Sequence, residues 1–288
     1  MRWVLELLAV IFGAYLVMSG IMLVFQERLV FPAPRGPLPA PESVGVTDAE
    51  SITVTTADGV KLRGWYLHPV PPPAESQRAP GLLWFYGNME TVGVLAPLLR
   101  ELRPPGTAVL ILDYRGYGTS EGRPTEPGLY LDADAAWDYL AGRDEVDDER
   151  ISVYGRSLGS VPALYLAENH DVRSVVLDSP FTNARGMAAI HYWYLPRFLM
   201  RLRLDNLARA RQLRVPLLVF HGSEDNIVPL RMGRAIAEEG RAEKFIEIEG
   251  AGHNDIYYVA GPRYREEMHG FLLGLRGEGL RGEGLLRD

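Results

Sequence analysis

Apolar residues in this chain form short runs separated by segments long enough for helices. The first two runs alternate apolar and polar residues on either side of Ala57-Asp58-Gly59, a turn sequence, which predicts an antiparallel hairpin. The later runs, such as AVLILD, SVVLD and PLLVF, are continuously apolar, which predicts parallel strands covered on both faces. The predicted strands are residues 51–56, 61–68, 81–86, 108–113, 151–154, 174–177, 216–220 and 245–248.

Helix-length segments fill the gaps between these strands. They predict a three-layer α/β sandwich with a mostly parallel eight-stranded sheet over residues 44–274. Residues 182–214 contain no strand pattern and are rich in aromatic residues and arginines, so we expect a short helical cap over a site. A helical excursion packed on the sheet edge is the alternative. The predicted helices are residues 90–102, 127–141, 158–168, 231–239 and 263–273.

The amino-terminal segment has a different character from the rest. Residues 7–25 are 19 uncharged residues, and roughly 20 apolar residues cross a hydrocarbon core of about 30 Å. We therefore expect a single-pass transmembrane anchor over residues 1–28, because the run is too long for a signal peptide and no A-x-A site follows it. The basic residues on the two flanks of this segment do not favour one orientation across the membrane over the other. We expect the catalytic domain to lie outside the cytoplasm.

The two ends of the domain carry segments without predicted chemistry. Prolines in residues 29–43 predict an extended linker between membrane and domain, and the glycine-rich residues 275–288 predict a flexible tail. The formal charge of −7 and the lack of a long basic run argue against a nucleic-acid partner. The absence of cysteine excludes disulfides, thiolate catalysis and cysteine-ligated zinc. The oligomeric state is left open.

The segment ISVYGRSLGS carries the main chemical prediction. Gly155, Ser157 and Gly159 form G-x-S-x-G directly after a predicted strand and directly before a predicted helix, which is the context this motif requires. The flanking glycines fit a turn so sharp that side chains would collide with the neighbouring strand and helix. We therefore expect Ser157 to be a nucleophile held in a strained backbone conformation.

A serine hydroxyl needs a base to remove its proton and a carboxylate to orient that base. Of six histidines, His253 lies in a glycine-rich loop after the last predicted strand, where it can reach back over the serine. Asp225 follows strand PLLVF and completes the order Ser, Asp, His. Asp178, at the end of the neighbouring strand, is the rival acid, and Glu224 is a minor alternative.

A tetrahedral oxyanion must be met by fixed N–H donors. We expect one from the backbone of Leu158, the residue after the nucleophile, and one from Asn88 in the loop after strand GLLWFY. No metal or organic cofactor is needed for this chemistry.

From residue 43 to residue 271 the chain resembles the alpha/beta hydrolase superfamily, in particular its small, single-pass membrane-anchored members. The motifs that match in order are TADGVKLRGWY, FYGNME, LDYRGYGTSEG, YGRSLGS, LDSPFTN, VFHGSEDNIVP and GAGHND. Such relatives usually have His-Gly-Asn in the second motif, so Tyr86 is a departure that affects how this loop is braced. The resemblance also implies that Asp113 and Arg115 shape the loop near the site.

The resemblance implies a serine hydrolase that cleaves carboxylic esters or thioesters through an acyl-enzyme. A peptidase of the same fold and a non-catalytic membrane-bound binding module are the alternatives. The predicted anchor suggests lipid or membrane-proximal acyl substrates. We expect aromatic residues to contact the substrate; they are Tyr86, Tyr192, Trp193, Tyr194 and Phe198.

Overall fold

A computed structural model describes residues 2–274 and contains an eight-stranded sheet of order β1-β2-β4-β3-β5-β6-β7-β8. The sheet is mixed, because β1, β2 and β4 pair antiparallel while β4, β3 and the remaining strands pair parallel. The predicted hairpin, the mostly parallel sheet and the alpha/beta class are therefore confirmed. The strands are β1 (Ala49–Thr55), β2 (Lys61–Leu67), β3 (Ala79–Phe85), β4 (Ala108–Leu112), β5 (Val146–Arg156), β6 (Val175–Asp178), β7 (Leu217–Gly222) and β8 (Lys244–Ile248).

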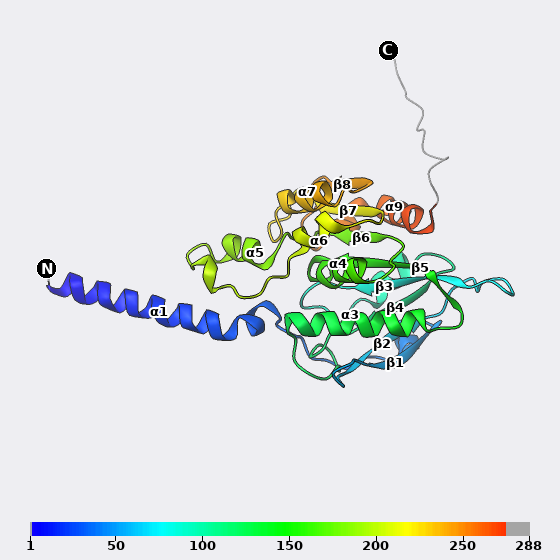
Figure 1. The fold of residues 1–288 in the computed structure, drawn as a ribbon, viewed down its shortest axis with the longest axis horizontal. Helices are drawn as coiled ribbons and strands as arrows, with labels where there is room; N and C mark the ends of the chain where they lie inside the picture. Colours follow the sequence, from blue (N-terminus) through cyan, green and yellow to red (C-terminus); the bar gives the residue numbers. More distant parts are fainter. Residues whose placement is uncertain (1, 275–288) are drawn as a thin grey trace, which may run out of the picture.

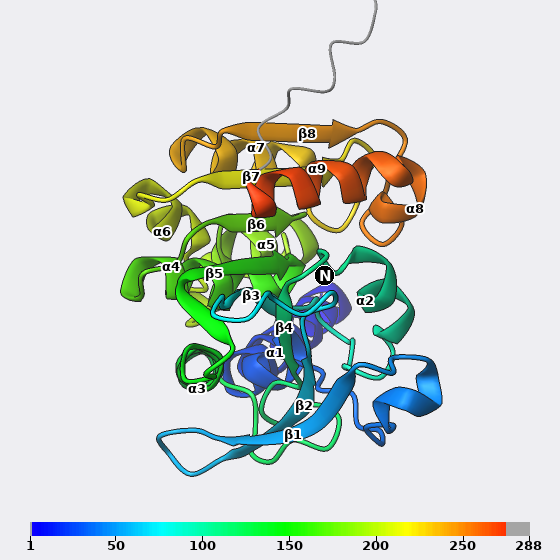
Figure 2. The same cartoon turned by 90° about the vertical axis from the view of Figure 1, so that its right-hand side faces the viewer.

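Helices cover both faces of the sheet, with α2 and α9 on one face and α3 and α4 on the other (Figure 2). Beyond α4, α6 and then α7 continue the second layer, each in contact with the helix before it. The helices are α1 (Arg2–Val30), α2 (Ala96–Leu102), α3 (Glu126–Ala141), α4 (Ser160–Asn169), α5 (Ala184–His191), α6 (Asn206–Gln212), α7 (Leu230–Glu239), α8 (Ile256–Ala260) and α9 (Pro262–Leu273). Short 3₁₀ turns occur at Pro41–Val44, Ser157–Gly159 and Arg197–Leu199.

The central strands explain the apolar runs in the sequence. Every residue of β4, β6 and β7 is buried, because helices cover these strands on both sides. From Ser51 to Thr55 the edge strand β1 alternates exposed residues with the partly buried Ile52 and the buried Val54, as a strand with one wet face does. The hydrophobic pattern thus places the core around β3 to β7, and the loops at the carboxyl ends of these strands lie together.

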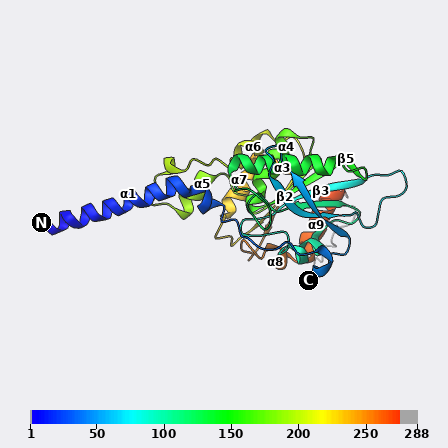
Figure 3. The same cartoon turned by 90° about the horizontal axis from the view of Figure 1, so that it is seen from below.

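Helix α1 projects away from the domain, and α5 lies beside its inner half (Figures 1 and 3). It has 29 residues, and its most apolar 18-residue window has a mean hydropathy of 2.5, so it is long and apolar enough to cross a membrane. Only Ser19, Met22 and Gln26 are buried, and these lie on one helical face at intervals of three and four residues. That face packs on the domain while the rest of the helix is open.

The proline-rich residues 29–43 do not form a free spacer. Residues 31–40 contain no helix, as the prolines predict, but Phe31 is buried in the core with 2% of its surface exposed. Arg35 Nη1 donates to Ser120 O at 2.9 Å, and Trp65 Nε1 donates to Pro39 O at 3.2 Å. The linker therefore lies along the domain surface and fixes where α1 leaves it. The tail at residues 275–288 lies outside the described residues.

Residues 182–214 form two different structures. Residues 184–204, with α5 and the turn Arg197–Leu199, project beside α1 as a cap. Helix α6, in contrast, packs between α4 and α7 and belongs to a helical layer of the sandwich. The cap interpretation thus applies to about the first two thirds of this segment. The interpretation as a packed helical excursion applies to the rest.

Candidate active site

Ser157 lies at the sharp turn between β5 and α4. Its φ is +49°, in the left-handed region that is unfavourable for residues other than glycine. A Cβ at Gly155 would lie 2.5 Å from Gly159 O, and a Cβ at Gly159 would lie 2.1 Å from Phe85 O. The two glycines are therefore required by close backbone approach, and together they hold the serine above the carboxyl edge of the sheet.

His253 lies between Ser157 and Asp225. Its Nε2 is 3.0 Å from Ser157 Oγ, and its Nδ1 is 2.7 Å from Asp225 Oδ2. The serine comes from the β5–α4 turn, the aspartate from the loop after β7 and the histidine from the loop after β8. The structure thus brings together all three residues that the sequence singled out.

The environment of Asp225 fixes the tautomer of the imidazole. Its Oδ1 accepts hydrogen bonds from Ile227 N at 2.9 Å and Val228 N at 2.7 Å. Burial by itself raises the pKa of Asp225, but the hydrogen bond and charge of His253 and the Val228 N–H outweigh it, so the net pKa lies below 3.8. An ionised Asp225 can only accept, so His253 donates from Nδ1 and leaves Nε2 free to accept from the serine.

The rival acids do not reach the imidazole. Asp178 is buried below the site, where its carboxylate accepts from Tyr264 OH at 2.9 Å and from Ser179 Oγ at 2.9 Å. Tyr154 OH lies 3.3 Å from the same carboxylate. Glu224 is exposed at the surface. Of the three carboxylates that the sequence left open, the structure places Asp225 alone in contact with His253.

The loop after β3 runs beside Ser157 and is rigidly held. The Asn88 side chain donates from Nδ2 to Val30 O at 2.6 Å, and its Oδ1 accepts from Tyr117 OH at 2.7 Å. Asn88 and Leu158 both line the cavity at the serine. The amide N–H groups expected to serve an oxyanion thus belong to residues at the site.

The expectation that Tyr86 contacts substrate is wrong. Tyr86 has 1% of its surface exposed, and its hydroxyl donates to Asp113 Oδ1 at 2.9 Å and accepts from Tyr114 N at 3.2 Å. It therefore braces the loop from below. Burial raises the pKa of Asp113 to about 6. Arg115 pairs with Asp132 and Asp58, so Asp113 and Arg115 do have the structural roles that the resemblance implied.

Arg156, which the sequence reasoning overlooked, joins two loops of the site. Its Nη1 forms an ion pair with Glu90, whose other oxygen accepts from Gly87 N at 2.8 Å. Its Nη2 donates to His253 O at 3.0 Å and to Asn254 Oδ1 at 2.8 Å. A side chain next to the nucleophile thus connects the loop of Asn88 with the loop of His253. Its position inside the G-x-S-x-G motif is the feature of the sequence that could have indicated its place at the site.

A mainly apolar cavity of about 410 Å³ opens at Ser157. Its walls come from the last turn of α1, from α5 and from the segment before α6, and they include Leu29, Val30, Phe181, Met187, Tyr192, Met200 and Leu204. Tyr192 is at the wall, as expected. Trp193 and Phe198 are exposed over 79% and 78% of their surfaces and are not among the residues that line this cavity, so their contact with substrate stays a prediction.

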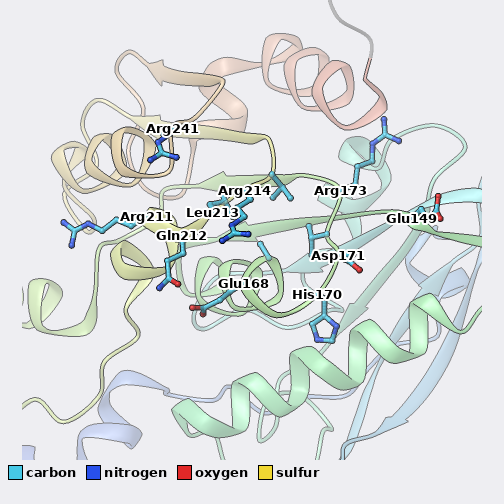
Figure 4. A pocket seen from close by; sticks show the side chains of 13 residues that line it. Glu149, Glu168, His170, Asp171, Arg173, Arg211, Gln212, Leu213, Arg214 and Arg241 are labelled. Carbon is cyan, nitrogen blue, oxygen red and sulfur yellow. The ribbon is translucent and has the colours of Figure 1, made fainter.

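A larger hollow of about 860 Å³ lies elsewhere, near the amino ends of β6 and β7 (Figure 4). Arginines, glutamates and His170 surround it, with Arg173, Arg211, Arg214 and Arg241 among the labelled side chains. Ser157, His253 and Asp225 are not part of its lining. Within residues 2–274, no group of three or more His, Cys, Asp or Glu side chains is placed to hold a metal ion. That the reaction needs no cofactor stays a prediction.

The fold and the serine at its sharp turn define a class. A family model described as alpha/beta hydrolase fold matches residues 80–211, and together with the relative described next it shows that the chain belongs to the alpha/beta hydrolase superfamily. It is 30% identical to the alpha/beta hydrolase domain-containing protein WAV2 of Arabidopsis thaliana, with 91% of this chain and 92% of the relative covered. It is also 36% identical to the uncharacterized protein Rv2307c of Mycobacterium tuberculosis, over 89% of this chain and 92% of the relative.

Solved structures agree on the fold. The Pyrococcus furiosus esterase Pf2001 superposes with a TM-score of 0.66 at 22% identity, covering 84% of this chain and 98% of the esterase. At this level of identity the likeness concerns the fold, and the site must carry the functional argument.

Proposed function

We propose that the chain is a serine hydrolase that cleaves carboxylic esters or thioesters through an acyl-enzyme. The observation that carries this proposal is the continuous hydrogen-bonded series from Ser157 Oγ to His253 at 3.0 Å and from His253 to Asp225 at 2.7 Å. Such a series lets an imidazole remove the serine proton during attack. The strained turn at Ser157 supports it, because strain of this kind is concentrated at functional sites.

In the first half of the reaction, Ser157 Oγ attacks the acyl carbonyl carbon while its proton moves to His253 Nε2. The negative charge that develops on the carbonyl oxygen is met by the backbone N–H groups of Asn88 and Leu158. Collapse of this intermediate breaks the bond to the alcohol or thiol, which leaves with the proton from His253. The acyl group then remains as an ester of Ser157.

In the second half, His253 takes a proton from water as the water oxygen attacks the acyl-enzyme. The tetrahedral intermediate collapses, the carboxylic acid departs, and the proton returns to Ser157 Oγ. Asp225 stays ionised throughout and stabilises the imidazolium that forms twice in each turnover. Its lowered pKa suits this role, because a protonated Asp225 would not hold the imidazole in the required tautomer.

The walls of the cavity favour an acyl substrate. Leu29, Met187 and Met200 offer apolar surface beside Ser157, which suits a hydrocarbon chain more than a polar acid component. We further propose that α1 is a single-pass anchor. Its buried Gln26 and the core residue Phe31 join α1 to the domain, which supports a retained helix over a cleaved signal peptide.

A covalent probe tests the proposed function directly. A fluorophosphonate should label the full chain at Ser157, and Ser157→Ala should lose labelling and ester hydrolysis by a factor on the order of 10⁴ or more. Ser51→Ala, at an exposed position of β1, is the matched control and should keep both. Labelling at another residue, or full esterase activity in Ser157→Ala, would contradict the mechanism.

A further inference from the structure

The cap is connected to α1 through polar contacts that have no part in the proposed chemistry. Gln26 Oε1 accepts from Arg201 N at 2.8 Å and from Leu202 N at 3.3 Å. Gln26 Nε2 lies 3.4 Å from Leu199 O. Further along the helix, Tyr15 OH donates to Tyr194 O at 3.2 Å. Residues 192–199, which we name the cap tip, therefore lie alongside the inner half of α1.

The cap tip presents large apolar side chains to its surroundings. Trp193 is 79% exposed, Phe198 78% and Tyr194 43%, beside the equally exposed apolar faces of α1. Contiguous apolar surface of this kind marks an interaction site. Because it continues the surface of a helix long and apolar enough to cross a membrane, the occupant that fits both surfaces at once is a lipid bilayer.

The spacing along α1 sets how far the cap tip reaches. Tyr15 and Gln26 are 11 residues apart, which is about 16 Å of helix or roughly half of a hydrocarbon core of about 30 Å. At the Gln26 end, Arg28 and Arg201 are exposed, at a level suited to lipid phosphates. If α1 crosses the membrane, the cap tip lies in the leaflet nearest the domain.

Irregular backbone is tolerated in lipid only where its polar groups have partners. In the cap tip, Tyr192 N donates to Ala188 O and Leu195 N donates to Tyr192 O. The carbonyls of Tyr194 and Leu199 are met by the side chains of Tyr15 and Gln26 on α1. The helix thus supplies two of the hydrogen bonds that water would supply to an exposed loop.

We propose that the cap tip inserts into the bilayer together with α1, so that the cavity at Ser157 receives its acyl chain from the lipid side. The walls of the cavity contain Leu29 and Val30 of α1 and Tyr192 at the base of the cap tip. An acyl chain that leaves the leaflet along the seam between α1 and α5 meets apolar surface up to the serine. The insertion stands independently of the chemistry, whereas this substrate route rests on the proposed function.

Insertion can be tested with a single fluorescent label, because the chain has no cysteine of its own. Phe198→Cys, carrying an NBD fluorophore, is compared in phosphatidylcholine vesicles with Val70→Cys, which is 49% exposed in the loop before β3. That loop lies at the opposite end of the sheet from Ser157. A phospholipid with a nitroxide on its acyl chain should quench label 198 at least about twofold more than label 70.

Equal, weak quenching at positions 198 and 70 would overturn the insertion. So would a disulfide between two copies of Phe198→Cys in vesicles at high lipid excess, because a second protein molecule would then occupy this surface. Both positions are exposed, so neither cysteine leaves a cavity in the core, and the labelled proteins are assayed as full chains.

The substrate route is tested by activity on two kinds of ester. Phe198→Glu should lower hydrolysis of a long-chain acyl ester embedded in vesicles by roughly tenfold and leave hydrolysis of a water-soluble acetyl ester unchanged. Phe198→Leu is the matched control and should keep both activities. An equal effect of Phe198→Glu on both esters, or on neither, would overturn the route. Absence of acetyl ester hydrolysis in the unaltered chain would instead contradict the proposed function.

Discussion

Two histidine–aspartate pairs in this chain have almost the same hydrogen-bond distance, although different ring nitrogens make the bond. His253 Nδ1 lies 2.7 Å from Asp225, and His170 Nε2 lies 2.8 Å from Asp134. The first pair lies at the carboxyl edge of the sheet beside the 410 Å³ cavity. The second lies between α3 and α4, with His170 at the rim of the larger, arginine-rich hollow.

The surroundings of the two pairs differ. The free nitrogen of His253 meets Ser157 Oγ at 3.0 Å, whereas the ring of His170 packs against Trp137 with 4.9 Å between ring centroids. The side chains of His253 and Asp225 are 7% and 0% exposed, and those of His170 and Asp134 are 21% and 33% exposed. In the buried pair the hydrogen bond is less screened by water, which makes it more effective in holding a charge.

The comparison shows that a histidine–aspartate pair is not by itself a catalytic unit. What distinguishes His253 is a serine hydroxyl that the backbone holds 3.0 Å from its free nitrogen and a mainly apolar cavity beside it. The volume of a hollow is a poor guide, since the larger one has no such serine among its lining residues.

The largest effect should come from removing the two imidazoles in turn. His253→Gln should lower kcat for ester hydrolysis by a factor on the order of 10⁴ to 10⁶, because in residues 2–274 only His253 hydrogen-bonds the Ser157 hydroxyl. His170→Gln should leave kcat within about twofold, with any effect confined to stability. Steady-state kinetics on a short acyl ester measures both. Comparable losses of kcat in the two variants would contradict the distinction between the two histidine–aspartate pairs.

An intermediate effect should follow from separating the loops that Arg156 connects. Arg156→Met removes the ion pair with Glu90 and the bonds to the His253 loop, so we expect kcat to fall roughly 10²-fold with KM little changed. Arg156→Lys should recover part of the loss, because it keeps the charge but cannot contact both loops.

Arg173→Met supplies the matched control for Arg156. Arg173 is exposed at the rim of the arginine-rich hollow, and its replacement should leave kcat unchanged. If Arg156→Met raised KM alone, Arg156 would be a substrate-binding residue and not one that positions His253.

The smallest effect concerns His221, a second histidine near Asp225. His221 Nε2 lies 3.5 Å from Asp225 and donates to Val228 O at 2.8 Å, and burial lowers the pKa of His221 below 6.5. Below pH 6.5 the unfolded chain takes up a proton at this residue while the folded chain does not, so stability falls as pH falls from 6.5 toward the lower folded pKa.

His221→Gln should reduce this dependence by up to about 1.4 kcal/mol per pH unit. Thermal unfolding in detergent at pH 5, 6 and 7.5 measures how steeply stability changes with pH in the unaltered chain and in the variant. The replacement should leave the slope above pH 7 unchanged, where His221 is neutral in both states. An unaltered slope below pH 6.5 would show that His221 does not titrate between the two states.

Much of the site could be predicted because its chemistry is local in the sequence. The turn at Ser157 requires two glycines within five residues, and the strand and helix around them are visible as an apolar run and a helical segment. The choice between Asp225 and Asp178 was harder. Both follow parallel neighbouring strands, and only the packing of Tyr264 and Tyr154 shows that Asp178 is held below the sheet edge.

The direction in which aromatic side chains face could not be predicted. Tyr86, Trp193 and Phe198 are all large and apolar, yet the first is enclosed in the core and the other two point outward. Tyr192 alone, in the same short segment, reaches the cavity wall. A cap has one face toward the site and one away from it, and the residues on these faces do not repeat at a regular interval. The hydrophobic pattern therefore cannot show which face a given residue is on.

The sequence by itself determined the class of fold, the order of the strands along the chain, the nucleophile turn and the apolar length of α1. These properties depend on neighbouring residues, whose sterics and hydrophobic periodicity act over a few positions. Only the tertiary structure decided that Asp225 orients His253, that Arg156 joins two loops, and that Gln26 connects α1 to the cap. The contacts of Arg156 and Gln26 join residues 66 to 176 positions apart. The selection of Asp225 distinguishes carboxylates of equal chemistry by where the folded backbone points them.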